Sequence, residues 1–308
     1  MNTANKISGQ LVEDIKKQGW QVAVVSIARV KDLETEIDSK RQKGLLDPVL
    51  FDEYLASFDF ACENRLADTR SLIIVGVPQP QIRLVFETGH DSFPVMIPPT
   101  YAFSIDQLVA GKLDQFLSST SYHYQKIRLP EKLLAVRSGL AQYGKNNISY
   151  IPDLGSFYRP VVFVSNVPCE ADSWKEPTVM AECDKCTACM KACPSHAIST
   201  DRFQLYAERC LTFCNESTRD FPDWLRPAWH NSLVGCMICQ KVCPANKAVV
   251  KWIEAGVTFN ANETEHILNG TSKELLPRAT VEKLNRQDLL EYYDVLGRNL
   301  KALITGSN

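Results

Sequence analysis

The sequence predicts an α+β protein. Three observations support this class: helical and strand-like segments alternate along the first half, cysteines gather in one later block, and helical segments follow that block. The expected organisation has three parts, at residues 1–169, 170–250 and 251–308. The chain has 308 residues, a formal net charge of -2, and a composition that is 45% hydrophobic and 23% charged. These values are typical of a globular protein and argue against intrinsic disorder and a strongly basic nucleic-acid-binding protein.

The first part alternates between two hydrophobic periodicities. Residues 5–18 carry apolar residues at helical spacing, and residues 20–27 have the continuous apolar pattern of a buried strand. Alternation of this kind is typical of a sheet covered by helices. The further expected elements are a helix at 30–43, strands at 70–78 and 83–87, helices at 104–118 and 129–144, strands at 147–151 and 160–167, and, in the third part, helices at 260–270 and 288–304.

Targeting signals are missing from the sequence as given. No apolar run approaches the ~20 residues that a membrane helix needs. The first residues, MNTANKISGQ, are polar and lack the apolar core of a secretory signal. We therefore expect a cytoplasmic protein with no membrane partner.

The cysteines are distributed very unevenly. The chain has 11 cysteines, and all except Cys62 and Cys169 lie between Cys183 and Cys243. A secreted disulfide scaffold would be short and would spread its cysteines more evenly. The dense block therefore indicates metal ligation.

Two runs within the block have the spacing of iron–sulfur ligands. The first is C-x2-C-x2-C-x3-C-P, the bacterial ferredoxin run, whose fourth cysteine ligates a second cluster. Structural zinc is the alternative, but it explains neither the third cysteine at the same spacing nor the proline after each run. The spacing predicts two [4Fe–4S] clusters. The first run is Cys183, Cys186, Cys189, Cys193 and Pro194; the second is Cys236, Cys239, Cys243 and Pro244.

The second run lacks one ligand. Cys210 lies between the runs and can complete the set, with Cys214 as its rival. With Cys210 included, each cluster has four cysteine ligands. Cluster one then takes Cys183, Cys186, Cys189 and Cys243, and cluster two takes Cys193, Cys210, Cys236 and Cys239.

Three segments carry a family resemblance: AVRSGLAQYGKNN at 135–147, GSFYRPVVFVSNVP at 155–168, and the cysteine block through GCMICQKVCPANK at 235–247. With these segments the chain resembles the epoxyqueuosine reductase family, cobalamin enzymes with two [4Fe–4S] clusters and distant relatives of the reductive dehalogenases. In that family the isolated cysteine between the two runs ligates the second cluster, which favours Cys210. The resemblance implies a nitroreductase-like α/β cobalamin-binding core, a two-cluster ferredoxin-like domain and a short helical tail.

The resemblance also implies a corrinoid pocket. Gly139 and Gly144 permit close backbone approach to a large macrocycle, the short polar side chains suit the corrin amides and phosphate, and the tyrosines suit the ring face. On the pattern alone, QYGKNN is better explained as an ordinary helix terminus, and the family resemblance is what favours a corrinoid site. The implied cofactor-binding residues are Ser138, Gly139, Tyr143, Gly144, Lys145, Asn146, Asn147, Ser149, Tyr150 and Ser156.

The proton donor of the family is not matched. Family members carry an aspartate before the A-x-R-A-G-L helix, and an ungapped count places Gln125 there, although glutamine cannot act as a general acid. Nearby Tyr122, His123 and Glu131 are the candidate catalytic residues, because each side chain can donate a proton. Packing at the edge of a domain is the alternative role for these residues.

The carboxyl terminus also departs from the family. Residues 251–308 are too few for the helical repeats that contribute to tRNA binding, and no lysine- or arginine-rich stripe is present. tRNA is therefore a doubtful partner. We expect a reductase in which a donor such as ferredoxin or flavodoxin supplies electrons through two clusters to cobalamin and then to a small organic substrate. The alternatives are an electron-transfer or corrinoid-reducing protein without substrate turnover, and a tRNA epoxyqueuosine reductase with another proton donor.

Overall fold

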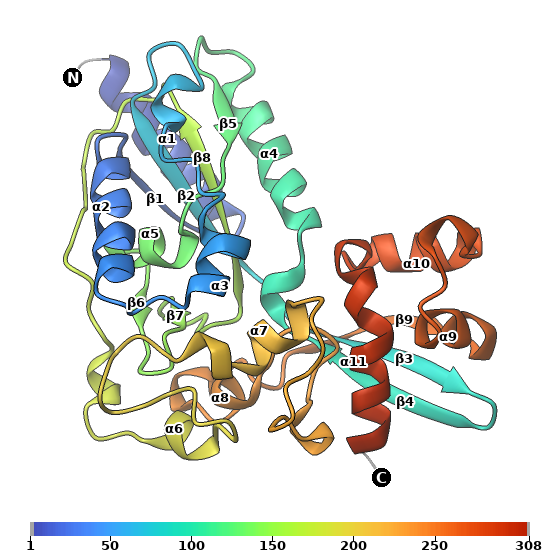
Figure 1. Cartoon of the computed structure of the whole chain (residues 1–308). Coiled ribbons are helices and arrows are strands. Elements are labelled where there is room, and N and C mark those ends of the chain that lie inside the picture. The colour runs from blue at the N-terminus through green and yellow to red at the C-terminus, as the bar shows by residue number, and fades with distance from the viewer. Residues whose placement is uncertain (1–2, 307–308) are drawn as a thin grey trace. The chain divides into compact units, whose positions relative to one another are not determined.

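The computed structural model describes residues 3–306, and its contacts divide the chain into two units (Figure 1). Unit 1 comprises Met1–Pro78 and Phe103–Cys186, and unit 2 comprises Gln79–Ala102 and Thr187–Asn308. Both units contain helices and sheets, which confirms the α+β class.

A four-stranded antiparallel sheet forms the centre of unit 1, in the order β1-β2-β8-β5. Its two middle strands are β2 (Ser71–Pro78) and β8 (Tyr158–Ser165), which pair along their whole length. Nearly every residue of these two strands is buried. Because the middle strands are covered on both faces, they have continuous apolar sequences instead of alternating ones.

Helices cover both faces of this sheet. Ile73 and Val75 of β2 pack with residues of α1 and α4, whereas Leu72 and Ile74 pack with residues of α2 and α5. Successive side chains of a strand point to opposite faces, so one strand contributes to two cores. Unit 1 is therefore a three-layer arrangement with the sheet in the middle.

The helices of unit 1 are α1 (Thr3–Lys17), α2 (Arg29–Gln42), α3 (Pro48–Leu50), α4 (Ser104–Leu117) and α5 (Glu131–Arg137). Its remaining strands are β1 (Gln21–Ser26), β5 (Tyr124–Lys126), β6 (Gln142–Tyr143) and β7 (Ser149–Tyr150).

The helix predicted at 129–144 is shorter than expected. α5 ends at Arg137, because Gly139 has a φ of 75°, in the left-handed region that glycine readily adopts at a helix end. The chain then forms the antiparallel hairpin β6–β7, so Gly144 lies in a hairpin and does not end a helix.

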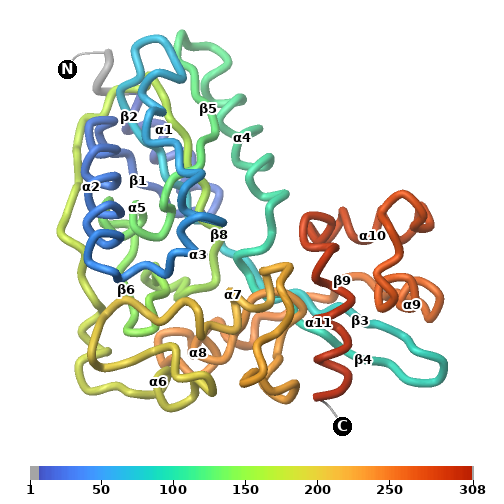
Figure 2. Tube along the Cα trace, viewed as in Figure 1, coloured from blue at the N-terminus to red at the C-terminus, as the bar shows by residue number. Residues whose placement is uncertain are grey.

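A three-stranded sheet organises unit 2, in the order β4-β3-β9 (Figure 2). β3 (Gln81–Thr88) pairs antiparallel with β4 (Asp91–Ile97) and parallel with β9 (Ile253–Phe259). This pairing assigns Gln79–Ala102 to unit 2, although the predicted first part, 1–169, included that segment. Strands so distant in sequence give no local sequence pattern that reveals their pairing. The structure divides into two units, whereas the sequence predicted three parts.

The tail at 251–308 is not purely helical. The expected helices are present, but β9 precedes them and α10 lies between them. β9 is mostly exposed, so its sequence lacks a strong apolar alternation. The helices of unit 2 are α6 (Ala188–Ala192), α7 (Leu211–Glu216), α8 (Ile238–Lys241), α9 (Ala261–Leu268), α10 (Arg278–Arg286) and α11 (Tyr293–Gly306). Within residues 3–306, no helix is long and apolar enough to cross a membrane.

Candidate functional site

The β6–β7 hairpin is attached to the segment that leads into the first cysteine run. The Tyr143 N–H donates to the Thr178 carbonyl at 2.9 Å, and the Tyr143 carbonyl accepts from the Met180 N–H at 2.8 Å. The two segments therefore pair like short parallel strands around Val179. This pairing fixes the chain three residues before Cys183.

Lys145 adds a second attachment. Its Nζ donates to the main-chain carbonyls of Asp184 at 3.1 Å and Cys186 at 3.3 Å. Hydrogen bonds from charged donors are stronger than those between neutral groups. A residue predicted for the corrinoid pocket thus holds the backbone of the first cysteine run.

Most of the predicted cofactor-binding side chains are buried and bonded within unit 1. Asn146 Nδ2 donates to the Tyr150 hydroxyl at 2.8 Å, and Ser138 Oγ donates to the Ala135 carbonyl at 3.1 Å. A Cβ on Gly144 would lie 2.6 Å from Asn146 Oδ1, so this position admits only glycine. The buried members of the set are Ser138, Tyr143, Gly144, Asn146, Asn147, Ser149, Tyr150 and Ser156.

Two members of the set are accessible instead. Gly139 is exposed, and Lys145 is half-buried. The buried side chains form a rigid frame, whereas Gly139 and Lys145 are the members that a ligand reaches without displacing a buried contact. Of the predicted set, Gly139 and Lys145 are therefore the candidates for direct contact with a corrinoid, and the buried members can contribute only as support.

Glu131 begins α5 beside a buried ion pair. Arg159 donates to Asp106 through Nε and Nη2, each at 2.9 Å, and Lys126 also contacts Asp106. Removal from water raises the pKa of Glu131 to about 7, and the positive charge of Arg159 opposes this rise. A carboxyl group with that pKa holds a proton near neutral pH, as a general acid must.

The structure does not bring the other two catalytic candidates to Glu131. The His123 N–H donates to Asn166 Oδ1 at 2.7 Å, at the carboxyl end of β8, and Tyr122 packs against the core around α1 and α4. Glu131 interacts electrostatically with Tyr158, at the amino end of β8. A strand of eight residues spans about 23 Å, so the candidates lie at opposite ends of the sheet.

Three cysteines of the predicted cluster two lie close together in unit 2. Burial raises the pKa of the Cys236 thiol to about 11, with smaller contributions to this rise from Cys210 and Cys193. Burial likewise raises the pKa of Cys210, with a contribution from Cys193. The three thiols are thus mutual neighbours, and none of them forms a disulfide.

Cys214, the rival of Cys210, has different surroundings. It is buried and packs with Leu211 and Leu225 in a small apolar cluster, against which Cys236 also packs. Burial raises the pKa of its thiol to about 11, with Cys210 as the neighbouring thiol that adds to this rise. Cys214 has the environment of a core residue.

Two buried side chains before Cys236 have polar atoms that lack a hydrogen-bond partner within residues 3–306. Both ring nitrogens of His230 and the Ser232 hydroxyl lack a hydrogen-bond partner among the described residues. Buried polar groups are rarely left unsatisfied, so such atoms indicate a group that is not part of the chain. Together with the three neighbouring thiols, they fit a cluster beside this segment.

Asn299 on α11 forms hydrogen bonds with the two segments that carry proposed ligands of cluster two. Asn299 is fully buried, and its Nδ2 donates to the carbonyls of Asn215 and Leu233, both at 2.8 Å. Asn215 Nδ2 in turn donates to the Gly235 carbonyl at 2.7 Å. The predicted tail thus fixes α7 and the segment before Cys236 to each other.

The first cysteine run is divided between the units, since unit 1 ends at Cys186 and the second segment of unit 2 begins at Thr187. Cys189 lies on α6 and is buried, and Cys243 is half-buried after α8. Among residues 3–306, no three His, Cys, Asp or Glu side chains converge closely enough to hold one metal ion. A [4Fe–4S] cubane is wider than a single metal ion, and each of its four cysteine ligands binds a different iron.

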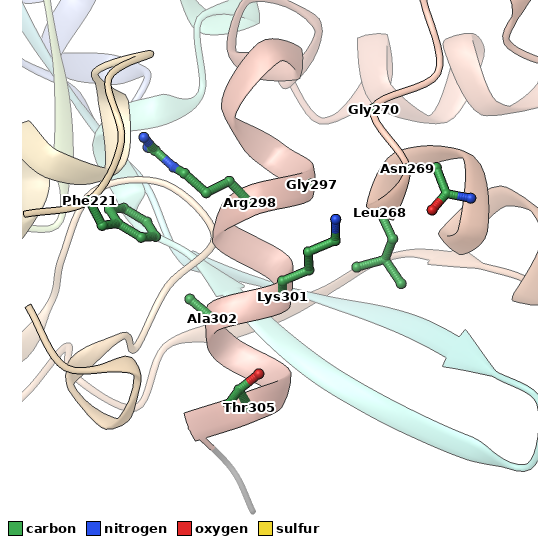
Figure 3. A pocket seen from close by; sticks show the side chains of 9 residues that line it. All are labelled: Phe221, Leu268, Asn269, Gly270, Gly297, Arg298, Lys301, Ala302 and Thr305. Carbon is green, nitrogen blue, oxygen red and sulfur yellow. The ribbon is translucent and has the colours of Figure 1, made fainter. Parts of the chain in front are cut away.

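A pocket of about 460 Å³ lies between α11 and the end of α9 (Figure 3). Arg298 extends from α11 toward Phe221, with its guanidinium carbon 4.0 Å from the ring centroid. Arg298 Nη2 also donates to the carbonyls of Cys214 and Ser217. None of the sequence-predicted site residues lines this pocket.

Comparison with protein families agrees with the site. The family described as "4Fe-4S double cluster binding domain" matches residues 182–246. The chain is 35% identical over 119 residues to the epoxyqueuosine reductase of Bacillus subtilis (strain 168), covering 39% of this chain and 30% of that protein. It is 37% identical over 120 residues to that of Synechococcus sp. (strain CC9605), covering 38% of this chain and 36% of that protein. The matches thus span about a third of each relative.

The whole chain is similar to solved structures. The epoxyqueuosine reductase of Streptococcus thermophilus superposes with a TM-score of 0.69 at 18% identity, covering 100% of this chain and 82% of that one. The B. subtilis enzyme gives 0.68 at 20% identity, covering 99% and 82%. A complex of epoxyqueuosine reductase with an epoxyqueuosine-modified tRNA stem loop gives 0.65 at 19% identity, covering 99% and 82%.

Fold and site together define a two-[4Fe–4S] protein with an α/β unit. These comparisons show that the chain is similar to epoxyqueuosine reductases, which agrees with the resemblance inferred from its sequence.

Proposed function

We propose that this protein is a reductase that uses two [4Fe–4S] clusters and cobalamin to reduce an organic substrate. The observation that supports it best is the double-cluster segment at 182–246, which is joined in one chain to an α/β unit of the epoxyqueuosine reductase fold. When bound, the clusters supply single electrons and cobalamin supplies a reducing cobalt centre, while the protein contributes positioning and protons.

The proposed ligands of cluster two are Cys193, Cys210, Cys236 and Cys239. The mutual proximity of the first three thiols supports this set, as does the apolar packing of Cys214. The proposed ligands of cluster one, Cys183, Cys186, Cys189 and Cys243, rest on the spacing of the two runs.

The proposed corrinoid site is the accessible edge of the β6–β7 hairpin. Gly139 is exposed just before the hairpin, where the Lys175 side chain lies beside it, and Lys145 carries a positive charge in the hairpin turn. The frame behind them is held by hydrogen bonds between buried side chains, which limits motion of the hairpin. Rigid support of this kind keeps a bound cofactor in a fixed position.

Glu131 is the proposed proton donor in preference to Tyr122 and His123. Its raised pKa supports the protonated form near pH 7, and Arg159 and Lys126 lie within electrostatic range to stabilise the carboxylate left after donation. Both members of the buried Asp106–Arg159 pair are held in place by hydrogen bonds. The Glu131 carboxyl group thus holds a proton beside a positively charged, ordered partner.

The substrate has two candidates. The sequence argues for a small molecule, because the net charge is -2 and no basic stripe is present. The second candidate is epoxyqueuosine within tRNA, favoured by the relatives and by the similar structure that holds a tRNA stem loop. A flavodoxin or ferredoxin remains the proposed electron donor, and a cytoplasmic location remains a prediction.

A single anaerobic experiment separates these possibilities. The protein with its clusters is reduced with titanium(III) citrate, mixed with cobalamin, and given either free epoxyqueuosine nucleoside or an epoxyqueuosine-modified tRNA stem loop. Mass spectrometry then measures the deoxygenated product. Conversion of the nucleoside supports a small substrate, and conversion of the stem loop alone supports tRNA. Reduction of cobalamin without either product excludes epoxyqueuosine as the substrate, whereas protein that neither binds nor reduces cobalamin contradicts the proposed reductase.

A further inference from the structure

Asn231 lies beside a proposed ligand of cluster two. Its side-chain Nδ2 donates to Cys236 Sγ at 3.3 Å and to the Trp229 carbonyl at 3.2 Å. Its Oδ1 accepts from the Met237 N–H at 2.8 Å. The side chain therefore contacts a cluster cysteine directly and is fixed by the backbone on either side.

The orientation of this amide is determined by its partners. The Met237 N–H can only donate, so the atom that faces it must be the amide oxygen. The Trp229 carbonyl can only accept, so the atom that faces it must be the nitrogen. Both requirements hold for one orientation, in which the NH2 group faces Cys236 Sγ.

We propose that Asn231 is a positioning residue that sets the reduction potential of cluster two through its hydrogen bond to Cys236. A cluster gains negative charge on reduction, and much of that charge lies on its sulfur ligands. A hydrogen bond to a ligand sulfur stabilises the reduced state more than the oxidised state, so it raises the potential. This inference rests on the proposed function, because it requires Cys236 to ligate a cluster.

The same segment contains the unsatisfied His230 ring and Ser232 hydroxyl, so polar groups are concentrated next to Cys236. Asn231 differs from both because its sulfur partner is identified. Ser195 Oγ lies 3.5 Å from Cys193 Sγ, but either atom of that pair can be the donor. Asn231 is therefore a residue for which donor, acceptor and direction are all defined.

Two substitutions test the role of the donor. Asn231→Leu removes both polar atoms at a similar volume. Asn231→Asp keeps an oxygen for the Met237 N–H but replaces the donor with a carboxylate oxygen. Asn285→Leu and Asn285→Asp are the matched controls, because Asn285 is exposed on α10. Iron and sulfide are counted in each protein, and both cluster potentials are measured by EPR-monitored redox titration.

We expect all five proteins to hold about eight irons, with one cluster shifted to a more negative potential in both Asn231 variants. A change of about tenfold in the reduction equilibrium corresponds to about 59 mV for one electron. The shift in Asn231→Asp should be the larger, because it adds a negative charge. Two clusters at unchanged potentials in both Asn231 variants would overturn this inference and leave the proposed function intact. Wild-type protein without clusters would overturn both.

Discussion

Lys145 Nζ donates to the main-chain carbonyl of Cys186 at 3.3 Å, which joins the β6–β7 hairpin to the first cysteine run. A second bond from the same nitrogen reaches the Asp184 carbonyl at 3.1 Å. The family resemblance placed Lys145 among the cofactor-binding residues. The structure gives it a further role, because it fixes the loop that carries Cys183 and Cys186.

Lys145→Met keeps the length of the side chain but removes the donor, so two loop carbonyls lose a charged partner. We expect cluster one to be lost on exposure to air about tenfold faster, because the loop that protects it moves more freely. Bleaching of the visible absorption measures this rate. Lys185→Met, at an exposed lysine of the same run, is the control. Equal bleaching rates in the two variants would contradict the role of Lys145.

Glu131→Gln tests the proposed proton donor. Loss of a general acid typically lowers turnover by about 10²–10⁴-fold. In the wild type, turnover should fall as the pH rises above about 7, the pKa to which burial raises Glu131, because the carboxyl group then loses its proton. Glu170→Gln, at an exposed carboxylate, is the control. A wild-type pH profile without a fall near 7, or full turnover in Glu131→Gln, would exclude Glu131.

The same carboxyl group makes stability depend on pH. Its pKa rises from 4.5 in the unfolded chain to about 7 in the folded one, so between these values the folded state binds more protons. The free energy of unfolding should therefore fall as the pH rises through this window. Glu131→Gln should remove that contribution, which denaturant unfolding at pH 5 and pH 8 measures. Identical pH dependence in the two proteins would show that the pKa of Glu131 is not raised by folding.

Cys210→Ala and Cys214→Ala distinguish the two candidates for the fourth ligand of cluster two. Cys210 neighbours both Cys193 and Cys236, whereas Cys214 packs with Leu211 and Leu225. Cys210→Ala should therefore lower the iron content by about four per chain, and Cys214→Ala should leave about eight. Iron and sulfide analysis measures both. The reverse pattern would assign the ligand to Cys214.

Asn299→Leu tests whether the two hydrogen bonds from Asn299 on α11 support cluster two. The change leaves the buried carbonyls of Asn215 and Leu233 without their donor, at a cost of about 1–3 kcal/mol for each. We expect lower stability and faster loss of cluster two, measured by thermal unfolding and EPR. Asn269→Leu, at an exposed position after α9, is the control. Unchanged retention of cluster two would show that the tail does not support it.

The sequence predicted the elements that have local signals. Continuous apolar runs identified β1, β2 and β8, and cysteine spacing alone identified the cluster segment. β9 was missed because its exposed sequence has no apolar alternation, and its pairing partner β3 lies far away in the chain. The predicted 129–144 helix failed because Gly139, and not Gly144, adopts the left-handed conformation that ends it.

The supporting residues of the site gave no sequence signal. Asn231 and Asn299 are single polar residues within ordinary segments, and their roles depend on which atoms the fold places opposite them. Asp106 and Arg159 form an ion pair across 53 positions of sequence, which no motif records. Spacing reveals ligands that share a loop, whereas residues that orient those ligands become visible only in three dimensions.

The central claim is that one chain holds two [4Fe–4S] clusters and a corrinoid. The most direct test is to purify the protein without oxygen, supply cobalamin, and measure iron, sulfide, zinc and cobalt per chain with the absorption spectrum before and after reduction. We expect about eight irons, about eight sulfides and about one cobalt, with a spectrum that changes on reduction. Zinc in place of iron, or eight irons with no cobalt after cobalamin is added, would contradict it.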